Sequence, residues 1–418
     1  MEKQYWGMTV TKKQLKGEVI KILTREALLK RKVRRHLQRV GFKRDEHGVL
    51  YLPVDSKDAI RAAHQLQRTE RSAKQKDFLQ TKFPKLSTYF AAGAEIVPVA
   101  VKPRLERVAS GTWQADLFKL ASLTWSVPVS PGFGRRLRYL VWDDGHERLM
   151  GILAIGDPVF NLRSRDEYIG WTGEQRGTQL IHTMDAYVLG AVPPYNQLLG
   201  GKVVAALLRT REIYDDFLAA YGARKGVISG KVNQARLAAI TTTSSMGRSS
   251  VYNRVKLDGR DYLKPVGYSS GYGHFHIPDK LFQDLRDYLR WKEHRYTDGH
   301  EFGKGPNWRM RVTRTALEMI GMRSNLMMHG IRREVFICEM ASNTVAFLKG
   351  EEAELDITEL KSVEEVAALA CKRWLIPRAS RDTSYSQWSK ADLVTLVSKS
   401  SGVRVSLDEP KKRKQARR

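Results

Sequence analysis

Short apolar runs separated by turn signals occupy the middle of the chain. Segments 136–142 (RLRYLVW) and 148–155 (RLMGILAI) flank Asp143-Asp144-Gly145, a pattern that predicts a β-hairpin. Further strands are predicted at 168–171, 185–192, 237–243 and 262–268, and helices at 196–208 and 279–291. The mixture predicts an α/β (α+β) fold with a central mixed sheet over residues 116–300.

The N-terminal part of the chain has a helical pattern instead. Apolar residues recur at helical spacing between a capping box at Thr11 and Gln14 and a stop at Gly41, and again over 57–83. Lys and Arg occupy the opposite faces of both predicted helices. We therefore expect a basic helical region over 1–90, followed by a linker at 91–115.

The last third of the chain is mixed. A C-terminal α/β region is expected over 301–400, with one helix through Val312 and Ile320 and another in the second half of the acidic stretch 350–370. A basic tail covers 408–418, and six of its last eight residues are Lys or Arg. This tail is either a phosphate-binding arm or a solubilising end.

Composition narrows the class of protein. The 418 residues include 72 Lys and Arg against 45 Asp and Glu, a net charge of +27, which favours nucleic acid as the partner over a membrane surface. Two cysteines exclude a disulfide framework and a cysteine-based zinc site. No apolar run approaches the roughly 20 residues that span a bilayer, and the N-terminus lacks a secretory pattern. We expect a soluble cytoplasmic protein.

A glycine pair lies between the predicted strand 185–192 and the helix after it. In the segment 192–202 (VPPYNQLLGGK), Gln197 precedes Gly200-Gly201 in a spacing similar to the pyrophosphate loop of the GNAT-type acyltransferase fold. Backbone N–H groups at such a helix start, with Lys202, suit a phosphate group. The alternative is a tight turn that needs glycine for packing. The segment adds a GNAT-like strand–loop–helix to the expected core.

Several separate blocks occur in an order similar to the DruA family, named for a component of the Druantia anti-phage system. They are RDEYIGW (165–171), GAVPPYNQLLGGK (190–202), SSVYNR (249–254), KPVGYSSGYG (264–273), GPNWRMR (305–311) and HGIRREVF (329–336). The resemblance covers roughly residues 115–390. It implies a role in DNA transactions, in phage defence or in mobile elements, where related domains lie beside transposases. It implies no catalytic mechanism.

Basic side chains beside hydroxyl-rich and glycine-rich loops are candidate phosphate ligands. The candidates for nucleic-acid binding are Lys202, Arg248, Arg254, Lys256, Arg332 and Arg333. The Tyr-rich loop 268–273 could stack bases of a single strand. The alternative is that these cations are solvated and their neighbours only cap turns.

Strand cleavage with Mg²⁺ requires carboxylates that converge on the metal ion. The candidate catalytic residues are Asp166, Asp185, Glu334 and His329, with Asp157 as a further carboxylate. Asp166 and Glu334 have adjacent arginines, so each alternatively forms a plain ion pair. Mg²⁺ is the expected cofactor of this hypothesis.

His274 and His276 form a second candidate metal site. If they lie in a strand, both imidazoles face the same side and could hold one ion. Tyr288 follows in a predicted helix, an arrangement similar to nicking enzymes that form a phosphotyrosine link. The alternative is two ordinary histidines.

The sequence thus supports three hypotheses. The first is a DNA-binding protein of phage defence or a mobile element, whose enzymatic form is a Mg²⁺-dependent endonuclease or nickase. The second is an acyl-CoA-dependent GNAT-type acyltransferase. The third is a non-catalytic assembly subunit whose acidic stretch 351–365 contacts a helicase or another defence subunit.

Overall fold

The chain folds into two compact units. The computed structural model describes residues 14–15, 18–19, 23–47, 50–53, 56–130, 132, 134–225, 230, 232–299, 306–322 and 324–408. We call residues 1–53 with 272–329 the helical unit, and residues 54–271 with 330–418 the sheet unit. Each unit is made of two separate segments of the chain, so its boundaries differ from those of the predicted regions 1–90, 116–300 and 301–400. Within the described ranges, no helix is long and apolar enough to cross a membrane.

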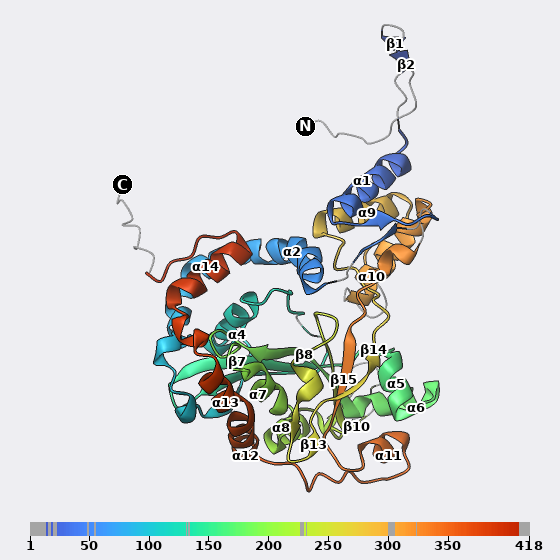
Figure 1. The fold of residues 1–418 in the computed structure, drawn as a ribbon. Helices are drawn as coiled ribbons and strands as arrows, with labels where there is room; N and C mark the ends of the chain where they lie inside the picture. The colour runs from blue at the N-terminus through green and yellow to red at the C-terminus, as the bar shows by residue number, and fades with distance from the viewer. Residues whose placement is uncertain are drawn as a thin grey trace, which may run out of the picture. The chain divides into compact units, whose positions relative to one another are not determined.

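A seven-stranded mixed sheet forms the centre of the sheet unit, in the order β14-β15-β11-β8-β7-β6-β5 (Figure 1). The strands are β5 (Pro103–Arg107), β6 (Arg136–Asp143), β7 (Arg148–Gly156), β8 (Thr183–Ala191), β11 (Ala239–Thr243), β14 (Lys264–Tyr268) and β15 (Glu334–Glu339). Only the neighbours β8 and β11 are parallel, and the other pairs are antiparallel. The predicted α/β class and central mixed sheet are confirmed.

Helices cover both faces of this sheet (Figure 1). The first face carries α7 (Gly200–Ala206), α8 (Arg211–Tyr221) and α12 (Val363–Ala370). The second face carries α3 (Lys76–Leu86), α4 (Trp113–Leu123) and α14 (Lys390–Ser401), with α5 (Arg163–Ile169) and α11 (Thr344–Lys349) over β11 and β15. The sheet unit also contains α2 (Lys57–Ala73), α6 (Gly173–Gln179), α13 (Ile376–Arg381) and the short strands β9 (Ala223–Lys225), β10 (Val232–Gln234), β12 (Lys256–Leu257) and β13 (Arg260–Asp261). Burial on both faces explains why β7 is an almost continuous apolar run.

The helical unit packs three helices. They are α1 (Arg25–Arg39), α9 (Asp279–Trp291) and α10 (Pro306–Met319). Before α1 lies the two-stranded pair of β1 (Gln14–Leu15) with β2 (Glu18–Val19), and after α1 lies that of β3 (Lys43–Arg44) with β4 (Leu50–Tyr51). Thr24 caps α1, because its Oγ1 accepts from the Ala27 N–H at 3.2 Å. Leu29, Val33 and Leu37 form the buried stripe of α1, so its cations face outward.

Several sequence predictions are confirmed. The strands predicted at 136–142, 148–155, 185–192 and 237–243 correspond to β6, β7, β8 and β11, and the helix at 279–291 is α9. The helix predicted through Val312 is α10, and the one predicted in the second half of the acidic stretch 350–370 is α12. The shorter predicted runs at 196–208 and 262–268 are structured over only part of their length, as α7 and β14.

Other predictions are wrong at identifiable places. The helix expected from Thr11 begins at Arg25, because Gln14–Leu15 and Glu18–Val19 are paired strands on either side of the poor helix former Gly17. The strand expected at 168–171 is instead the end of α5, which stops at left-handed Gly170. The expected linker contains edge strand β5 and the start of α4. Thr11 and the segment 411–418 lie outside the described residues.

Candidate nucleic-acid interface

Most of the predicted phosphate ligands lie along one edge of the central sheet, the edge that is formed by the ends of its strands. Strands β8 and β11 both end there, and the antiparallel strand β15 begins there. The glycine-pair loop, the SSVYNR block and the IRR segment therefore meet at the same edge. We call the cations of this edge the basic rim: Lys202, Arg248, Arg254, Arg332, Arg333 and Arg373.

Glu334 holds the SSVYNR loop in place. Its Oε2 accepts hydrogen bonds from the Ser249 backbone N–H at 2.9 Å and from Asn253 Nδ2 at 2.7 Å. The Glu334 side chain is buried, at 6% exposure. Removing this carboxylate would leave both donors unsatisfied, so Glu334 is an anchor of the loop that carries Arg254. It forms no ion pair with Arg332 or Arg333 in the described part of the chain.

Three cations of the rim lie close together. Burial lowers the pKa of Lys202, and the charges of Arg254 and Arg373 lower it further. The Lys202 ammonium also lies 5.5 Å from the centre of the Trp374 ring. Arg373 is a residue that the sequence did not single out, because it lies in a helical segment with no loop motif. Clustered like charges with no counter-charge attract an anion.

The remaining predicted cations differ in their surroundings. Arg332 is exposed and stacks over the Tyr268 ring at 5.3 Å, and Arg333 donates from Nη2 to His64 Nε2 at 3.1 Å. Lys256 instead lies 3.9 Å from Asp261. Across the described residues, no cation of the basic rim has a carboxylate partner, so the rim keeps its full charge for a ligand.

The glycine pair has a packing role. The Gly200 N–H donates to Tyr195 O at 2.8 Å, and the Lys202 N–H donates to Leu199 O at 2.8 Å. A Cβ atom on Gly200 would lie 2.6 Å from Tyr195 O, closer than real contacts allow. These amides are therefore occupied within the turn, which favours the tight-turn interpretation over a phosphate cradle.

The predicted catalytic carboxylates do not form a group of three within the described residues, although the charges of both Asp166 and Asp185 act on Arg165. Asp166 accepts from Arg165 Nη2 at 2.7 Å and from Arg176 Nη1 at 3.1 Å, so it belongs to a partly buried ion-pair network. Asp157 pairs with Arg135 at 2.6 Å, at the opposite edge of the sheet from the rim. Asp166 therefore follows the ion-pair alternative, and Asp157 is ion-paired as well.

Asp185 and Glu334 lie on opposite faces of the sheet. Thr241 pairs with both Asp185 and Ile337 across neighbouring strands, so these three side chains share the second face. Glu334 is three residues from Ile337 and therefore faces the other side. His329 belongs to the helical unit. Within the described residues, no three His, Cys, Asp or Glu side chains are grouped to hold a metal.

Asp185 has a titration that can be measured. Burial raises the pKa of this carboxyl to about 6, opposed by a hydrogen bond from Thr241 Oγ1 at 2.8 Å. Ionisation of Asp185 therefore lowers the stability of the folded protein as the pH rises from the ordinary carboxyl range through 6. Asp185→Asn, which keeps an acceptor for Thr241, is expected to stabilise the protein by on the order of 1–2 kcal/mol at pH 8.

The same substitution should have little effect at pH 4, where the wild-type carboxyl is protonated when folded. Urea unfolding at the two pH values measures the difference. An equal gain at both would contradict a titration origin.

The proposed histidine pair does not have the geometry that its metal role requires. His274–His276 lie in a turn region rather than a strand, so they do not share a strand face. His276 Nε2–H donates to Leu326 O at 2.9 Å, and burial lowers the pKa of His276 to about 4. Tyr288 is also buried, at 2% exposure, and its hydroxyl contacts Glu26. The hydroxyl of a tyrosine nucleophile must reach a DNA strand, so the burial of Tyr288 disfavours the phosphotyrosine interpretation.

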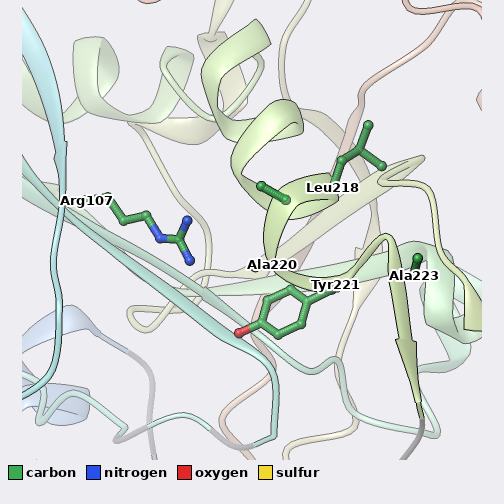
Figure 2. Close-up of a pocket in the computed structure, with 6 residues that line it drawn as sticks. Arg107, Leu218, Ala220, Tyr221 and Ala223 are labelled. Carbon is green, nitrogen blue, oxygen red and sulfur yellow. The ribbon is translucent and has the colours of Figure 1, made fainter.

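A separate cavity of about 560 Å³ lies between β5 and the end of α8 (Figure 2). Arg107 and Tyr221 line it with small apolar residues. Arg107 pairs with Asp216 at 3.4 Å, and the Tyr221 hydroxyl donates to Arg136 O. It contains none of the predicted site residues, so the rim remains the candidate site.

The fold and the rim define a class of protein. It is a mixed α/β protein in which basic side chains without carboxylate partners, within the described residues, gather where the central strands β8 and β11 end and β15 begins. The family model "Druantia protein DruA" matches residues 54–350. A relative from Escherichia coli (strain UMEA 4076-1), named Druantia protein DruA, is 56% identical over 383 residues, which cover 92% of this chain and 95% of the relative. The chain belongs to the DruA family, as its motif blocks predict. No solved structure matches it.

Proposed function

We propose that this chain is a DNA-binding component of a Druantia-type anti-phage defence system. The observation that carries the proposal is the basic rim, whose cations have no carboxylate partner among the described residues. Elsewhere in the sheet unit, exposed cations such as Arg104 and Lys361 are paired with acidic side chains. Membership of the DruA family supports the defence role, and the charge of +27 supports a polyanion.

A second basic surface supports the same function. Arg31, Arg34 and Arg35 are exposed on one side of α1, and none of them has an ion pair within the described residues. An α-helix fits the major groove of DNA, where arginine binds guanine edges and phosphates. The helical unit therefore supplies a candidate for base contacts, while the rim supplies phosphate contacts.

Binding of labelled single-stranded and double-stranded DNA at low salt, with and without Mg²⁺, tests the proposal. We expect retention of at least one DNA form in both conditions. Failure to bind either form would overturn the proposal. DNA products that form only with Mg²⁺ would add the nuclease or nickase activity, and Asp185 would be the first carboxylate to replace because its pKa is raised.

Acyl transfer is the second candidate. The antiparallel run β5–β8, the parallel partner β11 and a helix beginning at a glycine pair are similar to a GNAT-like core. However, β8 and β11 pair only as far as Asp185 and Thr241, and beyond that point the Tyr252 hydroxyl donates to Leu189 O at 2.7 Å. The Tyr252 side chain is therefore hydrogen-bonded to the backbone of β8 beyond the point where β8 and β11 stop pairing. Calorimetry with millimolar acetyl-CoA should therefore give no heat, and saturable binding would revive this candidate.

An assembly role is compatible with DNA binding. Residues 351–354 are exposed and include Glu351, Glu352 and Glu354, which suits a basic surface on another subunit of the system, such as a helicase. Copurification of the chain with its genomic neighbours tests this role. Reversal of the three charges to lysine should abolish copurification while leaving DNA binding intact.

A further inference from the structure

Helix α2 brings three basic side chains to one of its faces. His64, Arg68 and Arg71 follow each other at spacings of four and three residues, which places them along a single helical stripe. This stripe faces the start of β15, because Arg333 Nη2 donates to His64 Nε2 at 3.1 Å. Arg71 is fixed by a hydrogen bond from Nη1 to Val129 O at 2.6 Å.

Two arginines of this group have an unusual environment. The Nε atoms of Arg68 and Arg333 are buried and lack a hydrogen-bond acceptor in the described part of the structure. Burial alone lowers the pKa of both guanidinium groups, and no carboxylate opposes it. A buried donor without an acceptor destabilises the folded protein, and a charged one does so more strongly.

Other buried arginines of the sheet unit are neutralised. Arg165 donates to Asp166, Val159 O and Phe160 O, and Arg135 donates to Asp157 and to two backbone carbonyls. Arginine is rarely buried unless it is paired in this way. Arg68 and Arg333 instead have no carboxylate partner among the described residues, and each keeps a buried Nε donor without an acceptor.

His64 cannot supply this counter-charge, but it orients Arg333. Because its Nε2 accepts from Arg333, its proton lies on Nδ1, which is 3.4 Å from Gln67 Oε1. Burial, and then the charge of Arg333, lowers the pKa of His64 to about 4. The imidazole therefore stays neutral near pH 7 and acts as a positioning residue for the guanidinium.

We propose that Arg68 and Arg333 form a seat for a phosphate group between α2 and the start of β15. Guanidinium groups bind phosphate oxygens through paired, charge-assisted hydrogen bonds, which would satisfy both Nε donors. The phosphate belongs either to a DNA strand held along the basic rim or to a free nucleotide. The first case rests on the proposed function, whereas the second does not.

Calorimetry and thermal unfolding of the full chain test the seat. The probes are inorganic phosphate, ATP, and a single-stranded oligonucleotide with and without a 5′-phosphate. We expect at least one phosphate probe to bind the wild type, and Arg68→Gln and Arg333→Gln each to weaken that binding at least tenfold. Arg61→Gln is the matched control, since Arg61 is exposed on the same helix and paired with Asp58.

Arg333→Lys provides a second variant if Arg333→Gln fails to fold, and it should keep part of the affinity because the charge remains. Binding of inorganic phosphate or ATP identifies a free ligand, and a preference for the 5′-phosphorylated strand identifies the DNA source. No binding of any phosphate probe, or equal binding by Arg68→Gln and the wild type, would overturn the proposal. Arg333 belongs to the basic rim, whereas Arg68 does not. Arg68→Gln therefore tests the seat while every cation of the rim stays in place, and rim-dependent DNA binding can be measured on the same variant.

Discussion

Replacing Lys202, Arg254 and Arg332 together by glutamine is expected to weaken DNA binding about a hundredfold. Each of these side chains belongs to the basic rim and has no carboxylate partner among the described residues. A charge-assisted hydrogen bond to phosphate contributes about 1 kcal/mol or more, and three such losses reach this size. Fluorescence anisotropy with a labelled duplex and a labelled single strand at one fixed salt concentration measures the change.

The control for this triple variant has the same change in net charge. Arg104, Arg163 and Lys361 are exposed or half-exposed cations that pair with Asp144, Glu167 and Asp258. Their replacement by glutamine should change DNA affinity by less than about threefold, because paired surface charges contribute little. Equal losses in the two triple variants would show that overall charge, rather than the rim, controls binding.

Replacing Arg165 by methionine is expected to destabilise the sheet unit by about 3–5 kcal/mol, the usual cost of breaking a buried ion pair from one side. The Arg165 side chain is 0% exposed, and it donates to Asp166 Oδ1, Val159 O and Phe160 O. Its loss leaves two carbonyls without their donor and leaves the partly buried Asp166 carboxylate with Arg176 alone. Urea unfolding followed by circular dichroism gives the change in the free energy of unfolding.

The neighbouring Arg163 is a suitable control for this measurement. Its side chain is 89% exposed and pairs only with Glu167. Arg163→Met should therefore change the free energy of unfolding much less than Arg165→Met does. If Arg165→Met were as mild as Arg163→Met, the RDEYIGW block would not have the structural role described above.

The strands at the centre of the sheet were predictable because their sequence is nearly all apolar. The segment RLMGILAI of β7 is buried on both faces, and a short, nearly continuous apolar run is typical of such a central strand. β15 is not predicted from the sequence, because its first residue, Glu334, follows two arginines and is considered there as a candidate catalytic residue rather than as the start of a strand. The Gln14–Leu15 strand was missed because its apolar spacing also fits a helix.

The cations of the site were easier to predict than its carboxylates. Lys202 and Arg254 come after the ends of β8 and β11, and Arg332 comes just before the start of the antiparallel strand β15, so these segments meet whatever the exact register. Whether Asp185 and Glu334 share a face depends on strand register and parity, which the sequence does not reveal. Arg68 and Arg373 lie within helical segments, and only the fold shows what they approach.

The salt dependence of DNA binding by the wild-type chain tests the central claim most directly. If the basic rim neutralises phosphates, the logarithm of the association constant should fall with the logarithm of salt concentration between about 50 and 200 mM, with a slope of roughly −4 or steeper for a duplex. Each cation engaged contributes about −0.9 to that slope. A slope near zero, or no binding at about 50 mM salt, would contradict a DNA-binding role for the rim.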